Sequence, residues 1–116
     1  MKDCSKVERI TCIVDEDRTY NGEPLYRAIV EEAQKVGMAG ATVNKGIMGY
    51  GAAKKIHKER PLGRSSDIPI IIRIVDQKEK LDSFSDRICE MIPSGIIIRE
   101  PVTMCLVRCH EVTEKM

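Results

Sequence analysis

Ile68-Pro69-Ile70-Ile71-Ile72-Arg73-Ile74-Val75 is a run of β-branched residues with a proline near its start, where a lost backbone donor costs least. Asp76 and Glu79 follow with the spacing of a helix capping box. Apolar residues then recur at the spacing of one helical face: Leu81, Phe84, Ile88 and Ile92. This stretch predicts a strand over residues 68–75 and a helix over residues 77–92.

The chain before this stretch has the same kinds of pattern. Residues 7–14 alternate with a period of two, which predicts a first strand. Asn21-Gly22-Glu23-Pro24 supplies a cap and an early proline for a helix that Gly37 ends. The expected apolar face of that helix is Leu25, Ile29, Ala33 and Val36. Residues 41–47 read as a second strand, bulged at Gly46.

The last part of the chain completes a β-α-β-β-α-β order. Pro93-Ser94-Gly95 breaks the second helix, and residues 96–99 and 102–109 form a final extended segment that is kinked at Pro101. We therefore expect one domain over residues 1–116 with an α+β, ferredoxin-like sandwich and a long loop between strands 2 and 3. Both helices cover one face of such a sheet, so the apolar residues of the other face predict association between chains.

Composition excludes several classes of protein. The chain has 116 residues and a formal net charge of +1, so no global field draws it to nucleic acid or to a membrane surface. Residues 1–10 are polar rather than signal-like, and the apolar run at residues 68–72 is too short to cross a bilayer. These features predict a cytoplasmic location.

The five cysteines are an odd number in a chain without an export signal, which predicts reduced thiols rather than a disulfide framework. In a strand, Cys105 and Cys109 would share a face but lie about 13 Å apart, too far to bind one metal ion. We expect no metal site.

The glycine-rich segment at residues 40–51 carries the main functional signal. Its glycines allow backbone amides to turn outward and bind an anion such as phosphate. The alternative is that they only permit a bulge and a sharp exit, and the spacing leaves both open. Residues 52–66 then carry five cationic side chains against one acidic side chain, which suits a bound anion, an acidic partner or simply solvent. The absence of interleaved aromatic residues disfavours nucleic acid.

Several motifs agree, in order, with one family: Glu16-Asp17, Gly22-x-Pro24-Leu25-Tyr26, Gly40-Ala41-Thr42-Val43, Gly46-Ile47-x-Gly49-Tyr50-Gly51, Ile56-His57, Asp67-Ile68-Pro69 and Ile74-Val75-Asp76. The chain resembles the uncharacterised PII-like family of small prokaryotic proteins, some of which are fused to, or encoded beside, fluoride channels. More distantly it resembles the PII signal proteins. The resemblance implies a homotrimer that binds an adenine nucleotide between subunits and signals to a protein partner, such as a membrane channel or transporter.

The resemblance also implies positions for the site. Residues 52–66 correspond to the T-loop of PII proteins. The expected nucleotide-binding residues are Thr42, Lys45, Gly46, Gly49, Tyr50, Gly51, Lys54, Lys55, Val75 and Arg108. PII proteins hold phosphates with a glycine-rich loop carrying a lysine after the second helix, whereas this chain has only Pro93-Ser94-Gly95 there. AMP or ADP is therefore expected in preference to ATP.

Catalysis is not expected, because the sequence pairs neither His57 nor His110 with a nucleophile. A regulatory ligand-binding protein without a cofactor is the leading hypothesis. The alternatives are a metal-responsive trimer resembling the CutA proteins and a nucleotide-processing enzyme.

Overall fold

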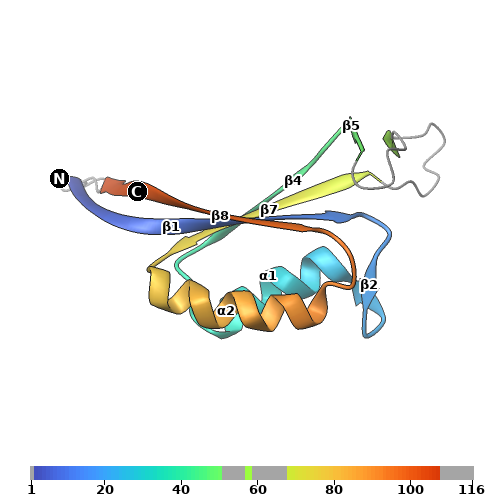
Figure 1. The fold of residues 1–116 in the computed structure, drawn as a ribbon, viewed down its shortest axis with the longest axis horizontal. Coiled ribbons are helices and arrows are strands. Elements are labelled where there is room, and N and C mark those ends of the chain that lie inside the picture. The colour runs from blue at the N-terminus through green and yellow to red at the C-terminus, as the bar shows by residue number, and fades with distance from the viewer. Residues whose placement is uncertain (1, 51–56, 59–67, 108–116) are drawn as a thin grey trace, which may run out of the picture.

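The computed structural model describes residues 2–50, 57–58 and 68–107, and only the backbone at residues 2, 57 and 58. In this part of the chain a four-stranded sheet forms one layer and two helices form the other (Figure 1). The strands are β4 (Ala41–Lys45), β7 (Pro69–Asp76), β1 (Lys2–Asp15) and β8 (Ile96–Val107), in that spatial order. Every neighbouring pair in this sheet is antiparallel. The predicted ferredoxin-like α+β fold class is confirmed.

Helices α1 (Leu25–Lys35) and α2 (Lys78–Met91) lie side by side against the same face of the sheet (Figure 1). Each helix has apolar residues on one side, and burying those residues against the strands stabilises the domain. The core is made of residues that are almost fully shielded from solvent: Ile10, Cys12 and Val14 from β1; Ile70, Ile72 and Ile74 from β7; Leu25, Ala28, Ile29 and Ala33 from α1; Leu81, Phe84, Ile88 and Met91 from α2.

The other face of the sheet, which we call the open face, has no described helix packed on it (Figure 1). Side chains alternate along a strand, so the neighbours of the core positions point to it. It comprises Thr42 and Asn44 of β4, Ile71, Arg73 and Val75 of β7, Arg9, Thr11 and Ile13 of β1, and Ile96, Ile98 and Glu100 of β8. Ile96 and Ile98 are each 45% exposed, so the face is apolar at one edge and polar at the other.

β1 begins five residues before the predicted strand, and β8 is one continuous strand where the sequence predicted a kink at Pro101. β8 runs through Pro101 without a break, and Pro101 pairs with Glu8 of β1. β8 is an edge strand, where a missing N–H group on the outer side costs no ladder bond. Beyond the point where β7 ends its pairing with β1, residues 2–7 and 102–107 continue as a two-stranded ribbon.

The sequence pattern predicted that Asn21-Gly22 caps the first helix, and this prediction is wrong. Asn21-Gly22 instead forms the turn between β2 (Thr19–Tyr20) and β3 (Glu23–Pro24), with φ values of 50° and 85° at the two residues. Two positive φ angles make a type I′ turn, whose twist suits a tight hairpin. The cap position is Pro24, which makes no side-chain capping bond.

Asp76 connects two loops rather than forming the predicted capping box. One carboxylate oxygen accepts the Gln77 N–H at 2.7 Å, and the other accepts the Ala39 N–H at 2.9 Å. The Lys80 ammonium lies 3.4 Å from the second oxygen and also donates to the Gly37 carbonyl at 2.8 Å. Burial raises the pKa of Asp76, but these donors together outweigh it and hold the pKa below its usual value. Asp76 therefore ties the end of α1 to the start of α2.

The prediction that all cysteines are reduced is wrong for one pair. Cys4 and Cys105 form a disulfide between β1 and β8. The two residues are directly opposite in the strand register, which spacing along the sequence does not reveal because they are 101 positions apart. Cys12, which is buried, and Cys89, which is exposed, are free thiols.

Candidate functional site

The glycine turn after β4 packs tightly against Pro69 at the start of β7. The Gly46 N–H donates to the Pro69 carbonyl at 2.8 Å. A Cβ atom on Gly46 would lie 2.8 Å from Pro69 Cγ, and one on Gly49 would lie 3.2 Å from the same atom. Neither glycine has a positive φ. The Gly46 amide is therefore used within the fold, and close packing, rather than an outward-turned backbone, explains why glycine stands at both positions.

The turn continues into a short hairpin. β5 (Met48–Gly49) pairs with β6 (His57–Lys58), with Gly49 opposite His57. The sequence predicted His57 within the basic loop of residues 52–66, and the structure pairs its backbone with Gly49 in this hairpin. Tyr50 follows β5 and is 66% exposed, and its neighbours Ile47 and Met48 are exposed as well. The exposed phenol ring of Tyr50 is available to stack on a planar ligand.

The structure brings together only some of the predicted site residues. Thr42 is opposite Arg73 in the register, and both lie on the open face with Val75. Lys45 does not join them, because its position in β4 is on the opposite side of the sheet, where its ammonium lies 3.3 Å from a carboxylate oxygen of Glu16. The remaining predicted residues, Gly51, Lys54, Lys55 and Arg108, lie outside the described residues.

Two residues of this region were not identified from the sequence. The Arg73 guanidinium donates to the Asn44 side-chain oxygen at 2.9 Å, and both side chains are exposed on the open face. Alternation could have found them, because Asn44 is two positions from Thr42 and Arg73 is two positions from Val75. Arg73 uses one of its five N–H donors in this bond, so it retains donors for an anionic ligand.

Arg99 of β8 is held by ion pairs within the fold. Its guanidinium bonds to Glu8 and lies 2.8 Å from Asp82 at the start of α2. Hydrogen bonding to Asp82 comes first among the causes that raise the pKa of Arg99. These ion pairs join β8 to β1 and α2, on the helix side of the sheet.

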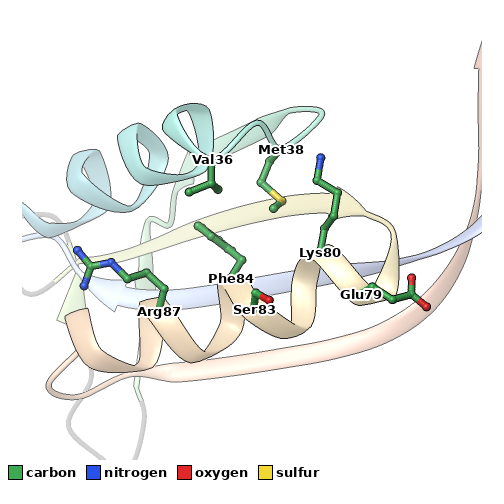
Figure 2. Close-up of a pocket in the computed structure, with 7 residues that line it drawn as sticks. All are labelled: Val36, Met38, Glu79, Lys80, Ser83, Phe84 and Arg87. Atoms are coloured by element: carbon green, nitrogen blue, oxygen red, sulfur yellow. The ribbon is translucent and has the colours of Figure 1, made fainter.

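A cavity of about 360 Å³ lies on the helix layer, away from the predicted nucleotide site (Figure 2). Val36, Met38 and Phe84 form its apolar wall, while Lys80 and Arg87 lie at its rim. Val36 was expected in the helix core but follows the last turn of α1 and is 46% exposed. Arg87 is already paired with Glu32 at 3.3 Å, and Lys80 with Asp76. The rim cations are thus neutralised, and the cavity has no evident preference for an anion.

Metal binding finds no support in this part of the chain. The described residues contain no group of three potential ligands from histidine, cysteine, aspartate and glutamate, and this includes the acidic turn at Asp15, Glu16 and Asp17. Among the same residues, no helix has the length and apolar character needed to span a membrane.

Comparison with known proteins identifies the family. The model of the family DUF190, described as "Uncharacterized ACR, COG1993", matches residues 7–104. This chain belongs to that family. A UPF0166 protein of Aquifex aeolicus (strain VF5) is 34% identical over 83 residues, which cover 72% of this chain and 79% of that protein. UPF0166 protein MJ1524 of Methanocaldococcus jannaschii is 31% identical over 110 residues, which cover 94% of this chain and 98% of that protein.

Two of the solved structures similar to this DUF190 protein are described as PII-like proteins. CPII of Thiomonas intermedia K12, a nitrogen regulatory PII-like protein bound to ADP, AMP and bicarbonate, has a TM-score of 0.63 at 12% identity, covering 88% of this chain and 91% of that one. A putative PII-like signaling protein of Thermus thermophilus has a TM-score of 0.62 at 17% identity, covering 90% of this chain and 93% of that one. At these identities the likeness establishes the fold. The predicted membership of an uncharacterised PII-like family is confirmed.

Proposed function

We propose that this protein is a single-domain, non-catalytic regulator that binds an adenine nucleotide, AMP or ADP in preference to ATP. Three copies form a homotrimer, and the nucleotide lies in the cleft between neighbouring copies. The occupied trimer signals to a protein partner in the cytoplasm, a membrane channel or transporter. The PII-like fold, shared with a protein whose structure holds ADP and AMP, supports this function.

The observation that carries the proposal is the polar row at the β4 edge of the open face. Thr42, Asn44 and Arg73 offer a hydroxyl, an amide and a guanidinium there, with Val75 as an apolar neighbour. A nucleotide needs an apolar contact for its base and hydrogen-bond donors for its ribose and phosphate, and this row supplies both kinds of group. Tyr50, exposed beyond the end of β4, supplies a ring for stacking.

The open face supports the assembly. Ile13, Ile71 and Val75 are half-buried on this face, and Ile96 and Ile98 are each 45% exposed. A contiguous apolar patch of this kind is typical of a surface that another protein covers. A second and third copy would bury it and would bring a neighbour against the polar row.

The preference for fewer phosphates follows from the turn after α2. A Cβ atom on Gly95 would lie 2.8 Å from the Ile13 carbonyl oxygen, so this turn packs onto β1. Pro93 and Ser94 add no cation. A third phosphate would therefore have no lysine at this turn comparable to the one in PII proteins.

Calorimetry with AMP, ADP and ATP tests the proposal. Thr42→Val removes one hydroxyl from an exposed site, and we expect roughly 2–12-fold weaker AMP binding, from a hydrogen bond of about 0.5–1.5 kcal/mol. Tyr50→Ala should weaken binding by about 1–3 kcal/mol through lost stacking. Thr103→Val, on the opposite edge strand β8, is the matched control and should bind like wild type.

Two results would contradict this function. If wild type binds none of the three nucleotides, the ligand class is wrong. If Thr42→Val and Tyr50→Ala bind as tightly as Thr103→Val, the site is misplaced. Light scattering tests the assembly independently, because three chains of 13.1 kDa give a mass near 39 kDa, and a stable monomer at micromolar concentration would exclude the cleft.

A further inference from the structure

The ribbon formed by residues 2–7 of β1 and 102–107 of β8 projects past the helix layer (Figure 1). Its register runs from Lys2 opposite Val107 to Val7 opposite Val102. β7 pairs with β1 only from Glu8 onward, so no third described strand supports the ribbon. The ribbon is a two-stranded extension of a four-stranded sheet.

Burial along the ribbon is slight. Residues 3–6 and 105–107 are exposed, and among the described ribbon side chains only Val7 is buried. A two-stranded ribbon without a packed face is marginally stable in water, because few apolar contacts offset the entropy of ordering the backbone. The ribbon needs another source of order.

The disulfide between Cys4 and Cys105 lies at the middle of this ribbon and is exposed at both residues. It joins positions 101 apart in the sequence, and a cross-link between distant positions causes the largest loss of conformational entropy in the unfolded chain. Its exposure leaves the sulfur atoms accessible to an attacking thiolate. The same bond therefore orders the ribbon and can be broken by a small dithiol.

We propose that the Cys4–Cys105 bond is a thiol–disulfide switch that sets the order of the ribbon. When the disulfide is reduced, a dithiol donates two electrons and two protons to it. The S–S bond breaks, Cys4 and Cys105 each become a thiol, and the dithiol becomes its own cyclic disulfide. With the bond broken, residues 2–7 and 102–107 separate at their free ends while the four-stranded sheet stays intact.

The ribbon also extends the open face, and this second step rests on the proposed assembly. Val102, Met104 and Leu106 share the side of β8 that carries Ile98. Glu100, which pairs with Arg9 at 2.8 Å, lies between Ile98 and Val102 on this side, so the apolar surface resumes on the ribbon beyond one ion pair. When the ribbon frays, the open face loses this extension, so reduction weakens the contact between copies.

Peptide mapping under non-reducing conditions comes first, with free thiols blocked at low pH. A peptide pair linking Cys4 to Cys105 is expected. If both residues are found as free thiols in air-oxidised protein, or if Cys4 is linked to Cys109 instead, the proposal is overturned.

Hydrogen exchange by mass spectrometry then measures the ribbon in the whole protein. After treatment with dithiothreitol, amides of residues 3–7 and 102–107 should exchange at least tenfold faster, with no change in residues 70–75. The double variant Cys4→Ser/Cys105→Ser should match reduced wild type with or without dithiothreitol. Cys89→Ser, which removes an exposed free thiol from α2, should match oxidised wild type. Equal exchange in the oxidised and reduced ribbons overturns the switch.

Sedimentation of the same samples separates the switch from the assembly. Weaker association of the reduced protein supports both steps. If exchange in the ribbon accelerates while association is unchanged, the link to assembly is overturned and the switch stands. If oxidised and reduced proteins are both monomers, the proposed homotrimer is wrong, and the exchange result alone decides the switch.

Discussion

The contact between the glycine turn and Pro69 gives a quantitative test of how the β4–β7 edge is built. In Gly46→Ala the new Cβ would lie 2.8 Å from Pro69 Cγ and 3.2 Å from the Pro69 carbonyl oxygen. A separation of 2.8 Å forces the ring or the backbone to move, and overpacking of this kind costs about 1–3 kcal/mol. The lower entropy of the unfolded alanine chain offsets about 0.4–1 kcal/mol of that cost. We expect a net loss of about 1–2 kcal/mol.

Gly49→Ala should cost less, between zero and about 1 kcal/mol, because a contact of 3.2 Å with the ring end needs only a small shift. Gly40→Ala is the matched control, since a Cβ there meets nothing within 4 Å and the residue has no positive φ. Urea unfolding at fixed protein concentration is the assay, and Gly46→Ala should lower the midpoint by roughly 0.5–1 M.

A double-mutant cycle isolates the contact. Pro69→Ala removes Cγ, so Gly46→Ala should cost about 1 kcal/mol less in the Pro69→Ala background than in wild type. The carbonyl oxygen of residue 69 remains, so the recovery is incomplete. If Gly46→Ala is as stable as Gly40→Ala, or if the cycle shows no coupling, close packing is not the reason for glycine at position 46.

Three further measurements test other parts of the structure. Asp76→Asn should lower the free energy of unfolding by about 1.5–3 kcal/mol at pH 7. The lowered pKa of Asp76 contributes its full stability above the unfolded value of 3.8 and loses it as pH falls through the folded-state pKa, so the effect of the mutation should shrink below pH 3.8. An equal loss at pH 7 and pH 2 in urea titrations would contradict this. Ile98→Glu should weaken self-association at least tenfold in sedimentation, about 1.4 kcal/mol or more. Val36→Glu changes an equally exposed residue on the helix layer and should leave self-association unchanged. Similar association by both variants would exclude the open face as the contact. Burial, with a smaller effect from the nearby Cys89, raises the pKa of Cys12 to about 12. At pH 8 iodoacetamide should therefore label Cys89 in the native protein and Cys12 only after unfolding in urea. Rapid labelling of Cys12 in the native protein would show that it is not buried.

The periodic parts of the sequence predicted the fold well. The alternation around Ile72 and the helical spacing of Phe84 both identified residues that are buried in the core. Errors occurred where one local signal had two structural uses. Asn21-Gly22 fits a helix entry and a hairpin turn, and the hairpin formed because β2 and β3 were there to pair.

The candidate site was predicted less completely. Thr42 and Val75 were placed through the family resemblance, and the structure puts both on the open face. Asn44 and Arg73 were missed because they are 29 positions apart in the sequence, and only the structure shows the hydrogen bond between their side chains. Lys45 was included but belongs to the other side of the sheet. A shared motif identifies a segment, whereas the pleat of the strand decides which of its residues lie on the open face.

Sequence alone determined the order of strands and helices, the apolar faces that form the core, and membership of the family, because each depends on preferences that act over a few neighbouring residues or on motifs read in order. Only the tertiary structure decided that Gly46 stands against Pro69, that Asp76 joins two loops and that Cys4 meets Cys105. These contacts depend on strand register and on how two layers pack. A shift of one residue in register would turn the side chains of the strand residues among them, such as Cys4 and Asp76, to the other face of the sheet.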